Sequence, residues 1–209
     1  MIISVVNMKG GTGKSTVATN LAVMFAGKDD VLLIDADSQQ SSLAWQRDRP
    51  DNLTPFSVIG LPTGNLHKEV ERIKSKFSVI IIDGGGRITA SAKAAVAVSD
   101  FILVPTVASK PDCIATQRFF AEVVDEVASI KGKVKGAILI NMLKGTIFNL
   151  SGQEQIKTLG YPVFESFLGH RIVYQEAFSK GMGVAEYEPK GKASDEVRQM
   201  FNEIKEAIA

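Results

Sequence analysis

The sequence predicts an α/β fold, a doubly wound and mostly parallel sheet with helices on both faces. Short apolar runs alternate with longer helical patterns along the whole chain, which is typical of βα units in a parallel sheet. Several runs, such as "SVIII" and "FILVP", are apolar almost throughout, as expected for strands that helices cover on both sides. Both observations favour the same architecture.

The expected elements follow from these two patterns in chain order. Apolar runs predict strands at Ile2–Asn7, Val31–Asp35, Phe56–Ile59, Val79–Asp83, Phe101–Val104 and Val134–Asn141, with a weaker one near Tyr161–Phe164. Helical patterns separate most of them, at Lys14–Phe25, Leu66–Lys76, Ala90–Val98, Ala115–Lys131 and Ser194–Ile208.

Length and composition indicate one globular domain over residues 1–209. The 209 residues, 45% of them hydrophobic, suffice for one sizeable core. Lys and Arg number 24 against 23 Asp and Glu, so the total charge favours no class of partner. The single cysteine, Cys113, excludes an internal disulfide framework. With no apolar run long enough to span a bilayer and no signal-peptide layout, we expect a cytoplasmic protein and no membrane partner.

The stretch Met8–Thr16, MKGGTGKST, has the features of a phosphate-binding loop. Its glycines let the backbone wrap closely round an anion, and the helix that begins near Lys14 offers free N–H groups. Lys14 would contact the β- and γ-phosphates, and the Ser15 hydroxyl would hold Mg²⁺. Met8 stands where the ordinary pattern has a glycine, and Lys9 is a second cation that a simple loop does not need. The predicted nucleotide contacts here are Lys9, Gly10, Gly11, Thr12, Gly13, Lys14, Ser15 and Thr16.

Carboxylates follow two of the predicted strands, at the sheet edge where ligands bind in such folds. Asp83 ends the run "FSVIIID" and would support Mg²⁺, although a strand-end aspartate alone is often a turn or cap residue. Asp35 and Asp37, two residues apart, can approach one metal and one water: one could support Mg²⁺ through its hydration shell while the other positions or activates the attacking water, and Asp35 is the expected metal carboxylate. The alternative is a charged turn in which Asp37 or Ser38 caps a helix. The segment Gly84–Gly86 is a flexible stretch suited to respond to the γ-phosphate, or a plain loop.

Three motifs, KGGTGKST, DADSQ and the strand-end IIID, resemble those of the deviant Walker ATPases of the ParA/MinD group. The resemblance covers nearly the whole chain and is greatest to short ParA-type partition ATPases. It implies a P-loop NTPase fold, ATP and Mg²⁺ as ligands, and an ATP-dependent homodimer in which Lys9 reaches the partner's phosphates. It assigns catalytic roles to Lys9, Lys14 and Asp37, and adenine recognition to Asn141. The KPD segment Lys110–Asp112 also resembles proline-bearing segments beside the nucleotide in that family.

The chain departs from the family pattern in two places. Ser38 stands where many members have a proline, and "GGGR" follows Asp83 in place of a proline-containing stretch. These differences affect the expected switch response more than ATP binding.

Charge distinguishes a DNA partner from a membrane. Residues 194–209 carry four acidic and two basic side chains, and the apolar stripe of this segment fits a helix on the core better than a membrane helix. Residues 131–192 carry nine Lys and Arg against five Glu, which could line a face for salt-sensitive phosphate contact or be a solvated rim. Because of the resemblance, Arg171, Lys144 and Lys180 are the expected DNA contacts.

The sequence therefore predicts a slow, Mg²⁺-dependent ATPase whose dimer binds DNA without sequence preference. The resemblance implies plasmid or chromosome partition on the nucleoid, with a ParB-like centromere-binding protein or an analogue as stimulating partner. Three alternatives stay open: positioning of a protein assembly on the nucleoid, a MinD-like membrane-associated regulator, and a metabolic P-loop enzyme such as a small kinase or synthetase.

Overall fold

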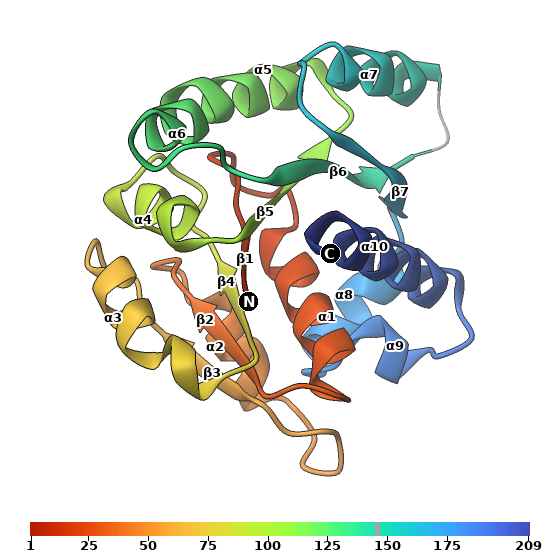
Figure 1. Cartoon of the computed structure of the whole chain (residues 1–209). Helices are drawn as coiled ribbons and strands as arrows, with labels where there is room; N and C mark the ends of the chain where they lie inside the picture. The colour runs from red at the N-terminus through yellow and green to blue at the C-terminus, as the bar shows by residue number, and fades with distance from the viewer. Residues whose placement is uncertain (145–146) are drawn as a thin grey trace.

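The computed structural model describes residues 1–144 and 147–209. Its strands form one sheet in the order β3-β2-β4-β1-β5-β6-β7, and every adjacent pair is parallel, which confirms the predicted architecture (Figure 1). The strands are β1 Ile2–Val5, β2 Val31–Asp35, β3 Ser57–Gly60, β4 Val79–Asp83, β5 Phe101–Val107, β6 Gly136–Leu143 and β7 Val163–Gly169.

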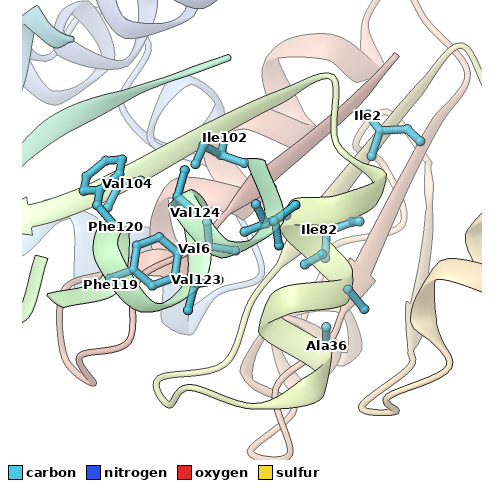
Figure 2. Packing of buried hydrophobic residues seen from close by; sticks show 14 of the residues in the cluster. Ile2, Val6, Ala36, Ile82, Ile102, Val104, Phe119, Phe120, Val123 and Val124 are labelled. Atoms are coloured by element: carbon cyan, nitrogen blue, oxygen red, sulfur yellow. The ribbon is translucent and has the colours of Figure 1, made fainter. Parts of the chain in front are cut away.

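Helices cover both faces of this sheet. On one face α1, α8, α9 and α10 enclose one apolar cluster. On the other, α3 to α7 enclose a second cluster, in which Phe119, Phe120, Val123 and Val124 pack towards Ile102 and Val104 of β5 (Figure 2). The helices are α1 Lys14–Ala26, α2 Ser41–Arg47, α3 Leu66–Ile73, α4 Ala90–Val98, α5 Lys110–Phe119, α6 Asp125–Lys131, α7 Ile147–Lys157, α8 Ile172–Ser179, α9 Val184–Tyr187 and α10 Lys192–Ile208.

The central strands are buried on both sides, as their mostly apolar sequences predict. Every residue of β1, β2 and β4 is buried, whereas the edge strand β3 is mostly exposed. The C-terminal helix α10 packs on the core through Val197, Met200 and Ile204, all fully buried, as expected. No helix among the described residues is both long enough and apolar enough to cross a membrane.

The helices differ from the prediction in two respects. The expected helix Ala115–Lys131 begins earlier, at Lys110, because the Ser109 side chain accepts from the Asp112 N–H and caps it. It also contains a π-helical turn, Phe120–Val124, between α5 and α6. Four helices, α2, α7, α8 and α9, have no counterpart in the prediction. Three of these span eight residues or fewer, too short for a clear 3.6-residue pattern.

The parallel strands bring distant polar residues to one edge of the sheet. Asp35 at the end of β2 lies in register with Asp83 at the end of β4. The loop after β1 lies beside them because β1 pairs with β4, with Val5 opposite Asp83. The carboxyl edge of the sheet therefore holds both acids and the glycine-rich loop.

Candidate nucleotide-binding site

The glycine-rich loop after β1 has the backbone that a phosphate-binding loop requires. Gly11 and Gly13 adopt φ values of 77° and 82°, in the left-handed region that other residues rarely enter. A Cβ added to Gly13 would lie 2.3 Å from Nδ2 of Asn141, so this position also lacks room for a side chain. Helix α1 begins directly afterwards at Lys14 and presents its free N–H groups at the loop.

Lys14 is buried within this loop. Its Nζ donates to the carbonyl oxygen of Lys9 over 2.9 Å. Burial lowers the pKa of the Lys14 ammonium, while the negative charges of Asp83 and Asp37 oppose that shift. The structure thus places one cation among the loop amides, as the sequence predicts, with two carboxylates close enough to affect it.

Asp83 is fully buried, and only one of its two carboxylate oxygens has a hydrogen-bond partner among the described residues. Its Oδ2 accepts from the Ser42 hydroxyl over 2.7 Å, whereas its Oδ1 has no hydrogen-bond partner among the described residues. Burial raises the pKa of Asp83 to about 7, against the Ser42 and Ser15 hydroxyls, which lower it. A buried carboxylate oxygen without a partner is costly unless a cation or water completes it.

The oxygen atoms at this edge fit Mg²⁺. In proteins this ion takes one or two carboxylates together with substrate phosphates and water. Asp83 offers one free oxygen, and Ser15, predicted as the hydroxyl ligand, lies in the first turn of α1 and lines the phosphate cleft. The described residues contain no cluster of three or more acidic, histidine or cysteine ligands, so the phosphates would supply much of the coordination.

Asp35 and Asp37 differ in what their oxygens do. Both oxygens of Asp35 accept backbone N–H groups, Oδ1 from Asp37 over 3.1 Å and Oδ2 from Leu43 over 2.9 Å. Burial raises the pKa of Asp35, although these two hydrogen bonds act to lower it. Asp35 therefore holds the turn between β2 and α2, and its predicted contact with the metal would have to be indirect. Asp37 is half-buried and lines the phosphate cleft, although its Oδ1 also accepts from the Gln39 N–H.

Lys9, the second cation, is paired within its own subunit. Its Nζ lies 2.8 Å from Oδ1 of Asp112, near the start of α5. The Lys9 side chain is 35% exposed and that of Asp112 only 10%. Lys9 thus lies at the mouth of the loop, held by one anion and still open to solvent.

Asn141 supports the loop from the end of β6. Its Nδ2 donates to the Thr12 carbonyl over 2.7 Å, and its Oδ1 accepts from the Met142 N–H. Met142 adopts a φ of 53°, one of two such non-glycine residues among those described. The amide of Asn141 contacts the protein through both ends, and its predicted contact with adenine stays a prediction.

A cleft of about 410 Å³ opens above the loop, lined by Lys14, Ser15, Asp37 and Gly86 among others. An adjoining cleft of about 510 Å³ shares Asp37 and Gly86 and extends to Arg87. The segment after Asp83 passes close to the loop, because a Cβ on Gly86 would lie 3.1 Å from Cα of Gly10. The segment therefore lies beside the phosphate loop, and its predicted response to the γ-phosphate stays a prediction.

The expected DNA contacts lie in different surroundings. Arg171 follows β7 and forms an ion pair with Glu196, from Nη2 to Oε1 over 2.6 Å. Lys180 follows α8, and its Nζ lies 4.7 Å from the centre of the Tyr187 ring. Lys144 is exposed just after β6. Arg171 is therefore already neutralised by an acid, whereas Lys144 has no described ion-pair partner.

Two residues of the site were not identified from the sequence. Ser42 reaches Asp83 from α2, a helix that was not predicted. The role of Asp112 as the partner of Lys9 was also missed, although its segment was noted. No local pattern could have identified either contact, because each joins segments far apart in the chain.

Comparison with known proteins agrees with this geometry. The model of a family described as CobQ/CobB/MinD/ParA nucleotide binding domain matches residues 3–184. Maintenance of carboxysome distribution protein A from Halothiobacillus neapolitanus is 27% identical, over 97% of this chain and 95% of its own length. Protein ParA from Rhizobium radiobacter is 24% identical, over 86% of this chain and 83% of its own. The structure of apo McdA from Cyanothece superposes with a TM-score of 0.82 at 18% identity, covering 100% and 99% of the two chains.

Proposed function

The chain belongs to the CobQ/CobB/MinD/ParA family of nucleotide-binding domains and is a ParA/MinD-like ATPase, and we propose that it is an ATP-gated dimer that positions a cargo on DNA. The observation that carries the proposal is Lys9. This lysine is partly exposed at the mouth of the phosphate loop, beside Lys14, which is buried and belongs to the same loop. A cation that its own nucleotide does not need is suited to a partner subunit's phosphates.

Each group at the site has a defined task in ATP hydrolysis. The loop amides and Lys14 hold the β- and γ-phosphates, and Asp37 orients the attacking water from the wall of the cleft. Ser15 and the free Oδ1 of Asp83 would hold Mg²⁺, which when bound neutralises charge that develops on the phosphates. Lys9 of each subunit would add a positive charge to the other subunit's phosphates.

Association would then depend on the number of phosphates. ATP presents more negative charge to a lysine supplied in trans than ADP does, so the dimer is favoured by ATP and weakened by hydrolysis. Pairing two chains would also double the basic excess of residues 131–192 on the dimer. Exposed lysines such as Lys144 would give salt-dependent DNA contact without sequence preference.

The names of the relatives bear on the cargo. One relative is a carboxysome distribution protein, which supports a protein assembly as cargo. Another is a ParA protein, in line with plasmid or chromosome partition and a ParB-like partner that stimulates hydrolysis. The carboxysome-distribution relative has the higher identity and coverage, so a protein assembly carried on the nucleoid is the cargo we favour.

The decisive experiment measures binding to random duplex DNA with ATP, ADP or no nucleotide, for the wild type and Lys9→Ala. We expect binding that needs ATP, weakens steeply with salt and is lost in the variant. Sedimentation of the same samples should show a dimer only for the wild type with ATP.

Two outcomes would contradict the proposal. A wild-type dimer with ATP that binds no DNA would exclude the DNA-linked role, and liposome sedimentation would then test a membrane-associated role. DNA binding by Lys9→Ala equal to the wild type would show that the second cation does not gate the interaction.

A further inference from the structure

The hydrogen bond between Ser42 and Asp83 crosses from α2 to the end of β4. The Ser42 hydroxyl and the Asp83 carboxylate are both fully buried, and they lie 2.7 Å apart, 41 residues apart in sequence. This bond occupies Oδ2 of Asp83 and leaves Oδ1 as the only oxygen of this carboxylate without a described partner. The bond to Ser42 therefore leaves Oδ1 as the open side of the carboxylate, towards Ser15, the other hydroxyl that affects Asp83.

We propose that Ser42 is a positioning residue that holds Asp83 with its Oδ1 directed to the metal of the Mg²⁺–ATP complex. The inference rests on the proposed function, because it assigns a role to a residue next to the predicted metal ligand. Ser42 does not itself contact the nucleotide or the metal. It acts by removing one rotational freedom from Asp83, as groups that hydrogen-bond a ligating carboxylate do.

Ser42 is itself held in place at both ends of α2. Directly after it, the Leu43 N–H donates to Oδ2 of Asp35 over 2.9 Å. At the other end, the indole N–H of Trp45 donates to the Met182 carbonyl, and the Trp45 side chain is buried. The backbone that carries the Ser42 hydroxyl is therefore fixed relative to β2 and to the segment after α8.

A purely structural role for this serine is the competing explanation. Buried helical hydroxyls usually bond to nearby backbone, as Thr19 does when its Oγ1 donates to the Ser15 carbonyl over 2.9 Å. Ser42 instead donates to a side chain on another element, and that side chain is the predicted metal ligand. A structural serine would contribute to stability alone, whereas a positioning serine affects the dependence of ATP binding on Mg²⁺.

The test measures equilibrium binding of a fluorescent ATP analogue as free Mg²⁺ is varied, with no turnover required. Ser42→Ala should raise the Mg²⁺ concentration at half-maximal binding about 10-fold, the lower end of the effect seen for groups that orient metal ligands. Binding in EDTA should be unchanged. In an Asp83→Asn background, Ser42→Ala should produce no further shift, because the group it positions is gone.

Ser99→Ala is the matched control. Ser99 is another buried serine, whose hydroxyl bonds to the Ala95 carbonyl and to the Ser4 hydroxyl and which lines neither cleft at the loop. It should lose stability without any change in Mg²⁺ dependence. If Ser42→Ala does not fold, Ser42→Cys, which donates weakly, is measured with the same expectations.

The outcomes separate this inference from the proposed function. Wild-type ATP binding that ignores Mg²⁺ would overturn the assignment of a metal-dependent ATPase. Wild-type binding that depends on Mg²⁺ while Ser42→Ala responds like the wild type would overturn only the role of Ser42. An equal shift with and without Asp83 would overturn it as well.

Discussion

The ion pair between Lys9 and Asp112 predicts that Asp112→Asn promotes ATP-driven dimerisation. In the structure Lys9 binds an anion of its own subunit, over 2.8 Å. To reach a partner's phosphates it has to leave that anion. Replacing the carboxylate with a neutral amide of the same shape removes this competing interaction, while the amide oxygen can still accept from the Ser109 hydroxyl that bonds to Asp112.

The size of the effect follows from the exposure of the pair. The Lys9 side chain is 35% exposed, so solvent screening limits the pair to about 1 kcal/mol, the upper end for exposed ion pairs. That energy corresponds to about 5-fold in an equilibrium constant. Two lysines change partners in each dimer, so the dimer dissociation constant should fall about 30-fold.

Sedimentation velocity with a non-hydrolysable ATP analogue measures this constant directly. Asp125→Asn makes the same change of charge at an exposed site, where the carboxylate accepts from the Tyr161 hydroxyl, and should leave the constant unchanged. An Asp112→Asn protein that dimerises no better than the wild type, or more weakly, would refute the reasoning. It would mean that Asp112 orients Lys9 for its partner and does not restrain it.

Three further predictions concern pH, stability and the segment after β4. Asp83 has a pKa of about 7 in the fold against 3.8 for the free side chain, so the folded protein keeps a proton that the unfolded chain loses between these values. In EDTA, the free energy of unfolding of the wild type should therefore fall as pH rises from about 4 to 7. In urea denaturation, the stability of Asp83→Asn relative to the wild type should grow over this range by up to about 1.4 kcal/mol per pH unit and then level off. A difference that stays constant with pH would contradict the raised pKa. Glu186→Gln leaves the buried Arg49, 2.6 Å from that carboxylate, without its counter-charge and should cost about 3 kcal/mol in the same assay, whereas a loss below about 0.5 kcal/mol would count against a structural ion pair. Gly86→Ala places a Cβ 3.1 Å from the backbone of Gly10, and calorimetry should show ATP affinity reduced about 10-fold, the scale of a 1–3 kcal/mol overpacking cost; unchanged affinity would mean that this segment is free to move aside.

The fold was predictable because its signal is local. The buried central strands are apolar runs with few polar residues, and four of the five expected helices match an observed helix to within three residues at each end. The helices that were missed are mostly short, and α2 has the additional difficulty that its first residues bond to strand-end acids. What holds α2 is the Leu43 N–H on Asp35 and the Ser42 hydroxyl on Asp83, and neither contact is visible in a window of sequence.

Within the candidate site, the residues whose proximity could be predicted are those that follow the ends of neighbouring strands. Lys14, Ser15 and Asp83 come together because the loop and β4 end at the same edge of a parallel sheet. The partners of these residues come from the tertiary register, which spacing does not encode. Asp112 approaches Lys9 because α5 follows β5, the strand next to β1, and that adjacency has to be seen in the sheet.

A hydrogen bond connects the two lysines of the loop, from the side chain of Lys14 to the backbone of Lys9. The Lys9 carbonyl accepts from Nζ of Lys14, and the Lys9 N–H donates to Oδ1 of Asn7 at the end of β1. A phosphate that draws the Lys14 ammonium towards itself would compete for the donor that now holds the Lys9 carbonyl. The backbone of Lys9, which would contact the partner's phosphates, is thus held by the side chain of Lys14, which would bind the phosphates of its own subunit. Occupation of the loop would therefore remove one restraint on the Lys9 backbone, leaving the bond from its N–H to Asn7 and the ion pair of its side chain with Asp112.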